Sequence, residues 1–402
     1  MLVLFYRTIK FKKSQLMLFQ KKFVGITLLI GLLLPIATFA CIWDHDTLQS
    51  EKFRFPDTLE LITGKFLRHS KEFYHWRIQD RITRLKSDPT NTSLLDDLAV
   101  SYEKTDNHEK AIEIAIETEK INPGRYETAA NLGTFYLHSG KFKEGLEQIE
   151  KAIKINPDAH FGREIYQKLL VEYLTKTQPN LPFNFPISTI IKTRNSPFHL
   201  ATNTFVDFLK EKSPEKKLTP QEVEKAVKGI LGMMKFGNYN SPVLLEALGF
   251  LLLYGDEKED AKQLAARAFL KASYEVVSGD SKSDYRFLAS RALFTQTSPE
   301  ARNKSVTLDQ IENEFKEELK DAEAWYNDLY QKEIAWIKSG KNPEKEFDKL
   351  YKQKPSTNHF SINKTEIIVL ILAICVALYI FYSQRTSSIE KATKRKAKHK
   401  KQ

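Results

Sequence analysis

The stretch "YETAANLGTFYLHSGKFKEGLEQIEKAIKINP", residues 126–157, decides the fold of this chain. Apolar and small side chains recur in it every three or four residues, a spacing that is typical of amphipathic helices. They form one stripe of Ala129, Leu132, Gly133 and Tyr136 and a second stripe of Gly145, Ile149, Ala152 and Ile155. Because Gly133 and Gly145 allow two helices to approach closely, the stretch predicts a helical hairpin that Pro157 brings to an end.

The same pattern stands 34 residues earlier, and Pro89, Pro123 and Pro157 follow one another at that interval. A fixed period of this length indicates an array of similar units. In residues 92–123 the first stripe consists of Leu95, Leu98, Ala99 and Tyr102, and the second consists of Ala111, Ala115 and Ile121. Since no hairpin can bury its apolar face alone, neighbouring hairpins are expected to stack.

These units resemble the tetratricopeptide repeat (TPR) family, which has 34 residues, Leu-Gly-x-x-Tyr on the first helix, Ala on the second and a terminal Pro. Residues 92–125 and 126–159 match this pattern, except that Gly145 and Ile149 replace the usual Ala and aromatic residue and the usual Trp is missing. The segment 242–273 is similar to a further TPR unit, with Leu248-Gly249 and Ala261, Ala265 and Ala268 at the same offsets. The resemblance implies an all-α, TPR-type helical-hairpin solenoid.

Positive charge is concentrated at the two ends of the chain. Residues 1–40 hold six Lys or Arg and no acidic residue, and residues 383–402 hold eight Lys or Arg and one Glu. The remaining middle is close to neutral, so a nucleic-acid-binding face is not expected. With only Cys41 and Cys375, the chain has no disulfide framework.

The N-terminal end, residues 1–40, is predicted to be a signal segment, with an alternative start at Met17. Two lysines precede an apolar run that ends in the small residues Thr38 and Ala40, as before a processing cut. An uncleaved anchor and lipidation of Cys41 are the alternatives.

A second apolar run, residues 367–382, predicts a single transmembrane helix through which the protein would contact the membrane. Because positive residues stay cytoplasmic, the tail 383–402 is expected in the cytoplasm and residues 41–366 on the periplasmic or other extracytoplasmic side.

Between these ends the sequence predicts five regions, of which the Pro-rich connector cannot form a helix through its four prolines. They are an N-terminal helical cap (41–91), TPR repeats plus a capping helix (92–177), the connector (178–200), a second helical, TPR-like region (201–339) and a polar linker (340–366). The second region is expected to end in one long helix, residues 307–339. The opening from Cys41 through "EKFRFP" and "GKFLRHS" is similar to uncharacterised bacterial envelope TPR proteins.

The family resemblance also implies candidate partner-binding residues on the concave face. These are Ser93, Asp96, Val100 and Glu103 in one repeat and Glu127, Ala130, Thr134 and His138 in the next. TPRs that clamp the carboxylates of chaperone tails use Lys and Asn at such positions, which this chain lacks, so that class of partner is not expected.

A second candidate lies in "GKFLRHSKEFYHWRIQDR", residues 64–81, which mixes aromatic with basic side chains. Read as a helix, it would bury Tyr74, Ile78, Ile82 and Leu85 and place Arg77 and Arg81 on another face. One interpretation is a face that binds anions or carboxylates, since Arg offers bidentate geometry. The other is a capping helix whose arginines pair with neighbouring acids.

Asp44, His45 and Asp46, together with His69 and His75, form a candidate metal-binding group, but no paired metal-ligand spacing joins them. The alternative is that residues 44–46 are simply the start of the mature chain. No nucleophile elbow, P-loop or GxGxxG motif occurs, so neither an enzyme nor a cofactor is expected.

The sequence therefore predicts a membrane-anchored TPR scaffold or adaptor that mediates protein–protein interaction on the exported side of the membrane. A metal-binding protein or enzyme built on Asp44, His45, Asp46, His69 and His75 is one alternative, and a purely structural spacer is another. The expected partner is a protein or peptide, with self-association as a further option.

Overall fold

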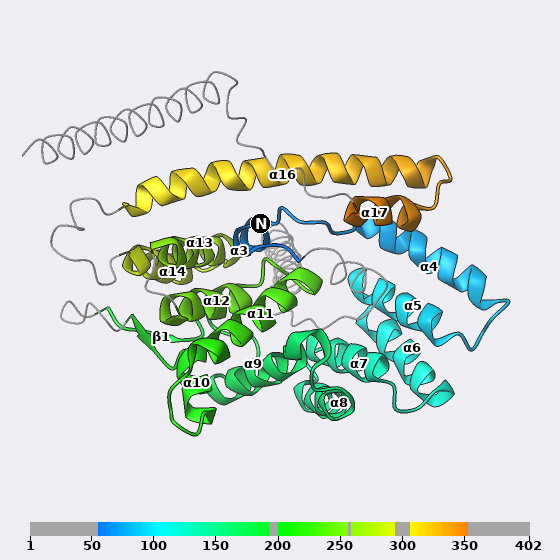
Figure 1. The fold of residues 1–402 in the computed structure, drawn as a ribbon, viewed down its shortest axis with the longest axis horizontal. Coiled ribbons are helices and arrows are strands. Elements are labelled where there is room, and N and C mark those ends of the chain that lie inside the picture. Colours follow the sequence, from blue (N-terminus) through cyan, green and yellow to red (C-terminus); the bar gives the residue numbers. More distant parts are fainter. Residues whose placement is uncertain (1–54, 193–199, 256–258, 294–305, 353–402) are drawn as a thin grey trace, which may run out of the picture. The chain divides into compact units, whose positions relative to one another are not determined.

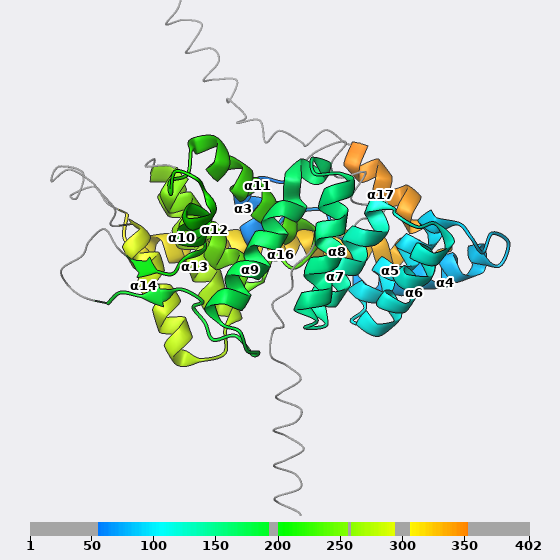
Figure 2. The same cartoon turned by 90° about the horizontal axis from the view of Figure 1, so that it is seen from below.

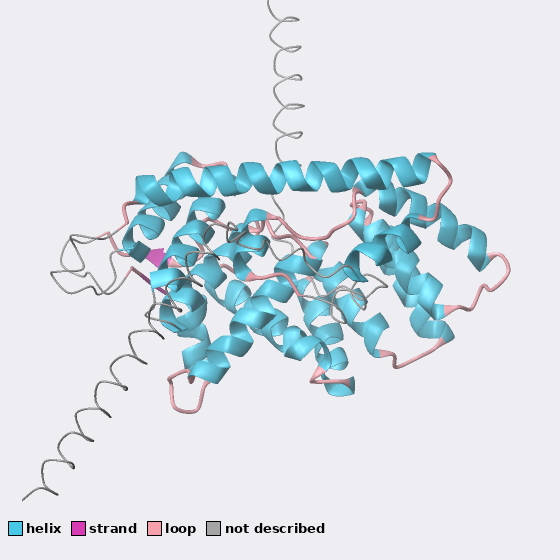
Figure 3. Cartoon of the chain, turned by 45° about the horizontal axis from the view of Figure 1, so that its top comes forward, coloured by secondary structure: helices cyan, strands magenta, loops and turns pink. Residues whose placement is uncertain are grey.

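The all-α class is confirmed by a computed structural model that describes residues 55–192, 200–255, 259–293 and 306–352, most of which are helical (Figure 1, Figure 3). The predicted signal segment, transmembrane helix and basic tail lie outside these residues. Within the described ranges, no helix combines the length and the apolar character that a membrane crossing needs.

The described elements follow one another as short antiparallel helices, one two-stranded ribbon and one long helix. They are α3 (Thr58–Thr63), α4 (Lys71–Leu85), α5 (Thr92–Lys104), α6 (His108–Ile121), α7 (Tyr126–His138), α8 (Phe142–Ile155), the 3-10 turn η1 (Ala159–Gly162), α9 (Arg163–Thr177), β1 (Thr189–Ile190), β2 (Ala201–Thr202), α10 (Phe205–Lys212), α11 (Pro220–Phe236), α12 (Pro242–Gly255), α13 (Glu259–Glu275), α14 (Gly279–Leu293), α16 (Leu308–Lys338) and α17 (Pro343–Lys352). From α4 to α9 each helix packs against the next one along the chain, and α11 to α14 do the same (Figure 2).

The two predicted hairpins are observed as the pairs α5/α6 and α7/α8. The close contact of α7 with α8 depends on glycine, as the sequence predicts. A Cβ on Gly133 would lie 2.7 Å from Ile149 Cδ1, and one on Gly145 would lie 2.5 Å from Leu137 Cδ2. The same device recurs in α12, where a Cβ on Gly249 would lie 2.6 Å from the Phe269 ring.

Two predicted core residues in these hairpins are wrong. Ile121 and Ile155 are 37% and 42% exposed, whereas Ala111, Ala115, Ile149 and Ala152 are buried. Each isoleucine is the last residue of its helix, just ahead of the Asn-Pro turn, and therefore lies beyond the contact with the partner helix.

The buried stripe of α4 also differs from the prediction. Phe73, Arg77, Ile78 and Arg81 are buried, whereas Ile82 is exposed and Tyr74 and Leu85 are only partly covered. Two arginines thus occupy an inward face that hydrophobic periodicity assigns to apolar residues.

The helix predicted to cap the first repeats instead continues the packing. Helix α9 contacts α8 on one side and α11 on the other, and its Leu170, Val171 and Leu174 are buried. One hydrophobic core consequently joins Leu137 and Ile149 to residues of α9 to α14 and α16, so the predicted regions 92–177 and 201–339 share it.

The Pro-rich connector contains no helix in its described part, as expected, and is tied to the core by Glu246. This fully buried carboxylate accepts hydrogen bonds from the backbone N–H groups of Ile187 and Ser188, at 2.9 and 2.8 Å. It also accepts one from the Tyr285 hydroxyl at 2.6 Å. Beyond this anchor, β1 pairs antiparallel with β2.

The predicted long helix is confirmed as α16, a 31-residue helix that contacts α13 and α14 near one end and α3 and α4 further along (Figure 1). Near its start, Glu312 accepts hydrogen bonds from both Nη groups of Arg286, at 2.7 and 2.8 Å, and from the Tyr274 hydroxyl at 3.0 Å. The hydrogen bond from Arg286 is the main cause that lowers the pKa of Glu312 to about 2.

The prediction that 340–366 is a linker is wrong for its first part, where α17 forms. Asn342 caps this helix through its side chain, Pro343 occupies the first helical position, and Phe347 and Tyr351 are buried. Asn-Pro-Glu followed by apolar residues at helical spacing is a helix-start signal that was present in the sequence.

Gly145→Ala is expected to lower the free energy of unfolding of the full chain, measured by urea denaturation in detergent micelles. Overpacking costs about 1–3 kcal/mol, which exceeds the gain of about 1 kcal/mol from helix propensity. Gly279→Ala is the matched control, because a Cβ there meets nothing within 4 Å. Equal effects of the two substitutions would contradict the close-packing argument.

Glu312→Gln is expected to cost about 1–3 kcal/mol of stability at neutral pH, since it removes a charge-assisted pair. The pKa of this carboxyl is depressed in the folded state, so its contribution is present above its ordinary value of 4.5 and is lost as the pH falls toward about 2. Urea titrations at pH 7, 4 and 2.5 should therefore show the difference between wild type and variant shrinking with acid. The exposed Glu317→Gln should differ little from wild type at every pH.

Candidate functional site

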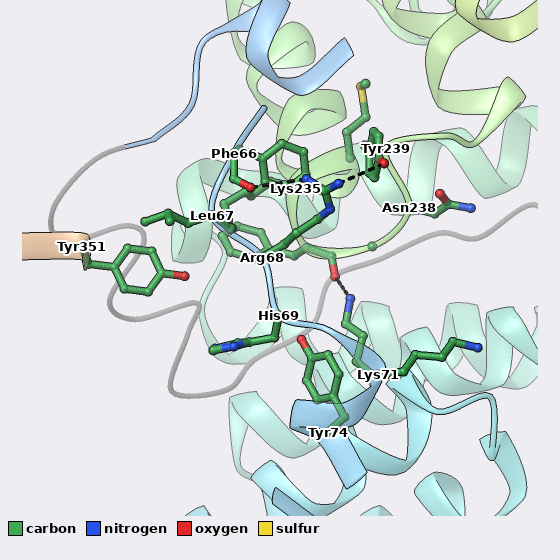
Figure 4. A pocket seen from close by; sticks show the side chains of 14 residues that line it. Phe66, Leu67, Arg68, His69, Lys71, Tyr74, Lys235, Asn238, Tyr239 and Tyr351 are labelled. Atoms are coloured by element: carbon green, nitrogen blue, oxygen red, sulfur yellow. Dashed lines mark hydrogen bonds between the residues drawn. The ribbon is translucent and has the colours of Figure 1, made fainter. Parts of the chain in front are cut away.

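The clearest candidate site is a pocket where the segment before α4 meets the turn between α11 and α12 (Figure 4). Its volume is about 200 Å³. It is lined by Phe66, Leu67, Arg68, His69, Lys71, Tyr74, Lys104, Met234, Lys235, Phe236, Gly237, Asn238, Tyr239 and Tyr351. These residues come from parts of the chain far apart in sequence, and four of them carry a positive charge.

Three of the four cations of the pocket contact backbone carbonyls or aromatic rings, and the fourth, Lys71, pairs with Asp106 outside the lining. Lys104 Nζ donates to the Phe236 carbonyl at 2.5 Å, and Lys235 Nζ donates to the Leu67 carbonyl at 2.6 Å. Among the described residues that line this pocket there is no Asp or Glu. The lining therefore carries a net positive charge.

Arg68 is the most enclosed of these cations by aromatic groups. Its guanidinium lies 3.5 Å from the centre of the Tyr326 ring and 4.8 Å from that of Tyr239, and it donates to the Tyr239 hydroxyl at 3.3 Å. Burial lowers the pKa of Arg68, because it removes water from the charged form. A bound anion would restore the lost solvation, so the pocket favours a ligand of negative charge.

The segment that supplies Arg68 is held in place by Glu333 of α16. This carboxylate is 1% exposed, and it accepts the Ser70 backbone N–H at 2.9 Å, the Ser70 hydroxyl at 2.5 Å and a hydrogen bond from His69 Nδ1. The His69 ring also stacks on Phe73, with 3.5 Å between ring centres. Ser70 is at the same time the N-cap of α4, so one contact fixes both the pocket wall and the helix start.

Such a pocket suits a carboxylate or phosphate group carried on an organic body. Guanidinium and ammonium groups donate charge-assisted hydrogen bonds to anionic oxygens. The rings of Phe66, Tyr74 and Tyr239 offer apolar surface for the carbon atoms of the same ligand.

Most of the residues predicted to line an open concave face are buried instead. Asp96, Val100, Ala130 and Thr134 are covered, Glu127 is half-buried, and only Ser93 is exposed. Asp96 pairs with Arg125 at 2.7 Å, and Thr134 accepts a hydrogen bond from Gln167 at 3.2 Å. The prediction of a free groove at these positions is therefore wrong, because neighbouring helices use the polar side chains as packing contacts.

Arg77 and Arg81 do not form an open face either. Arg77 Nε donates to Glu344 at 3.0 Å, and Arg81 donates to Asp97 at 2.8 and 3.0 Å and also pairs with Glu344. This is the second interpretation of the segment, with acids of α5 and α17 as partners. The quoted segment 64–81 does contribute cations to the pocket, but these are Arg68 and Lys71, which precede or begin the helix.

The proposed histidine partners of a metal site are not brought together. His69 is buried against Glu333, whereas His75 is exposed on α4. Asp44, His45 and Asp46 lie outside the described residues.

A different cluster joins Glu103 and His138, both predicted site residues, to His108, which sequence reasoning missed. Glu103 Oε2 and His108 Nδ1 are 2.9 Å apart, and Glu103 Oε1 contacts His138 Nδ1. Burial alone would raise the pKa of Glu103, but the hydrogen bonds from the two histidines lower it to about 2. Glu103 and His108 lie on either side of one hairpin turn, but His138 comes from the next hairpin. The three residues therefore share no local spacing that would have revealed the cluster in the sequence.

Comparison with protein-family models finds no match to this chain, and comparison with curated protein sequences finds no similar protein.

Glu333→Gln is expected to loosen residues 64–71, because a neutral amide cannot accept the three hydrogen bonds of the carboxylate equally well. The expected loss is about 1–3 kcal/mol in the free energy of unfolding. Hydrogen exchange with mass spectrometry on the full chain should show faster exchange in residues 64–71. Glu323→Gln, exposed on the same helix, is the control. Unchanged exchange in Glu333→Gln would show that the segment is held by other contacts.

Proposed function

We propose that this protein is a membrane-anchored helical-repeat adaptor that binds a protein partner on the exported side of the membrane. The observation that carries the proposal is the pocket of Figure 4, whose lining has four cationic side chains and no acidic one. The partner is expected to insert an acidic side chain or a C-terminal carboxylate.

The TPR-type assignment belongs to this proposal. It is supported by the helix pairs α5/α6 and α7/α8, and by the glycine contacts of α7/α8, which fall at the repeat positions of the sequence pattern. The membrane anchor and the exported orientation rest on the sequence of residues 1–40 and 367–382 and on the placement of basic residues.

Recognition at this pocket would have two stages. The positive lining attracts an acidic segment at long range, an effect that salt weakens. The anionic group then exchanges water for the donors of Lys71 and Arg68, while the aromatic walls cover its carbon atoms. Because Lys71 pairs with Asp106 at an exposed position, it is the cation that can turn to a ligand at least cost.

Charge reversal at Lys71 tests this proposal. A fluorescein-labelled peptide ending in four glutamates should bind the full chain in detergent micelles, and Lys71→Glu should weaken the binding about ten-fold or more, which corresponds to one lost charge contact of about 1.4 kcal/mol. Lys320→Glu makes the same change of charge at an exposed position of α16, outside the pocket, and should keep most of the affinity.

A photo-crosslinking residue at Asn238, which lines the pocket, should capture partners in native membranes. The same residue at Val277, which is 75% exposed and lies outside the pocket lining, is the control. Capture at 238 that disappears with Lys71→Glu would support the adaptor. Equal capture at both positions, or peptide binding that Lys71→Glu leaves unchanged, would favour the structural spacer.

A further inference from the structure

Three potential metal ligands meet where the first predicted hairpin contacts the second. Glu103 lies in the last turn of α5, His108 is the first residue of α6, and His138 is the last residue of α7. Figures 1 and 2 show these three helices side by side, and each contacts the other two. The packing of the hairpins thus places three helix ends, each with a ligand, around one point.

The distances within the cluster fit one small cation. One ligand atom from each of Glu103, His108 and His138 lies within 4.8 Å of the other two. Four-coordinate Zn²⁺ with bonds of about 2.0–2.1 Å places its ligand atoms about 3.3 Å apart. The pair Glu103 Oε2 and His108 Nδ1, at 2.9 Å, needs to open by only a few tenths of an ångström. His108 begins a helix and is 27% exposed in its side chain, so it has room to move.

The state of His138 is a second, independent observation. Its side chain is 5% exposed, and its Nε2 is buried with no hydrogen-bond partner in the described part of the chain. Its Nδ1 faces Glu103 and donates to that carboxylate. A metal ion would take the place of the proton on Nδ1, because a ligating nitrogen must be unprotonated.

We propose that Glu103, His108 and His138 form a site for a divalent transition-metal ion, for which Zn²⁺ is the probe. Two imidazoles and one carboxylate are a ligand set that suits Zn²⁺, and the exposed side of His108 leaves a fourth position for water. The site differs from the candidate metal site at residues 44–46, 69 and 75. It also does not depend on the cationic pocket of Figure 4. A bound ion would link the turn between α5 and α6 to the end of α7 and so hold the two hairpins in register.

The full chain in detergent micelles, stripped with EDTA and then dialysed against Zn²⁺, is expected to hold one equivalent of zinc by elemental analysis. His108→Gln should bind Zn²⁺ at least about ten-fold more weakly in competition with a chromogenic chelator, because even outer-shell losses cost that much. Zn²⁺ should raise the Tm of the wild type but not that of His108→Gln. Co²⁺ in the site should give the visible bands of a four-coordinate ion.

His75→Gln, at an exposed histidine of α4, is the matched control and should keep the zinc. Glu103→Gln and His138→Gln are second variants, with circular dichroism to check that they fold, while the part-exposed His108→Gln keeps the test valid if they do not. The proposal is overturned if the wild type holds no stoichiometric zinc. It is equally overturned if zinc is lost with His75→Gln or His45→Ala but kept in His108→Gln.

Discussion

The buried Glu333 carboxylate is the contact on which the pocket depends. It sits on the long helix α16, 264 residues from His69 in sequence, and it gathers hydrogen bonds from His69 and Ser70 in a region closed to water. Burying a carboxylate costs free energy unless its oxygens accept hydrogen bonds. Here they accept from His69, in the segment before α4, and from Ser70, the N-cap of α4. With that segment in place, Arg68 faces Tyr239 and Tyr326, and the cationic wall of the pocket exists.

The rest of the described chain combines small residues with buried charge. Gly133, Gly145 and Gly249 bring helices into contact at distances that a methyl group would block. Where the faces are polar, opposite charges meet across elements, as in Arg77 with Glu344 and Glu312 with Arg286. The apolar contacts stabilise the hairpins one after another, and the ion pairs join helices that are distant in sequence.

This arrangement explains why polar residues mapped from the repeat pattern do not form an open groove. Asp96 and Thr134 are used by Arg125 and Gln167, and Glu103 by two histidines. Within the described residues, cationic and aromatic side chains gather instead at the pocket between the segment before α4 and the α11–α12 turn. The function proposed for the chain therefore rests on loops and helix ends, where backbone geometry lets side chains of different elements converge.

The sequence by itself determined the all-α class, the hairpins of residues 92–159, the long helix ending near residue 339 and the basic, aromatic character of residues 64–81. These are properties of local spacing, since helical periodicity and Gly or Pro positions act within a few turns of chain. Only the tertiary structure decided which residues of those segments face inward. Arg77 and Arg81 became buried because Asp97 and Glu344 meet them, and Arg68 reached a pocket because Glu333 holds its segment. Such long-range pairings join residues whose separation carries no periodic signal, so no pattern within one segment could reveal them.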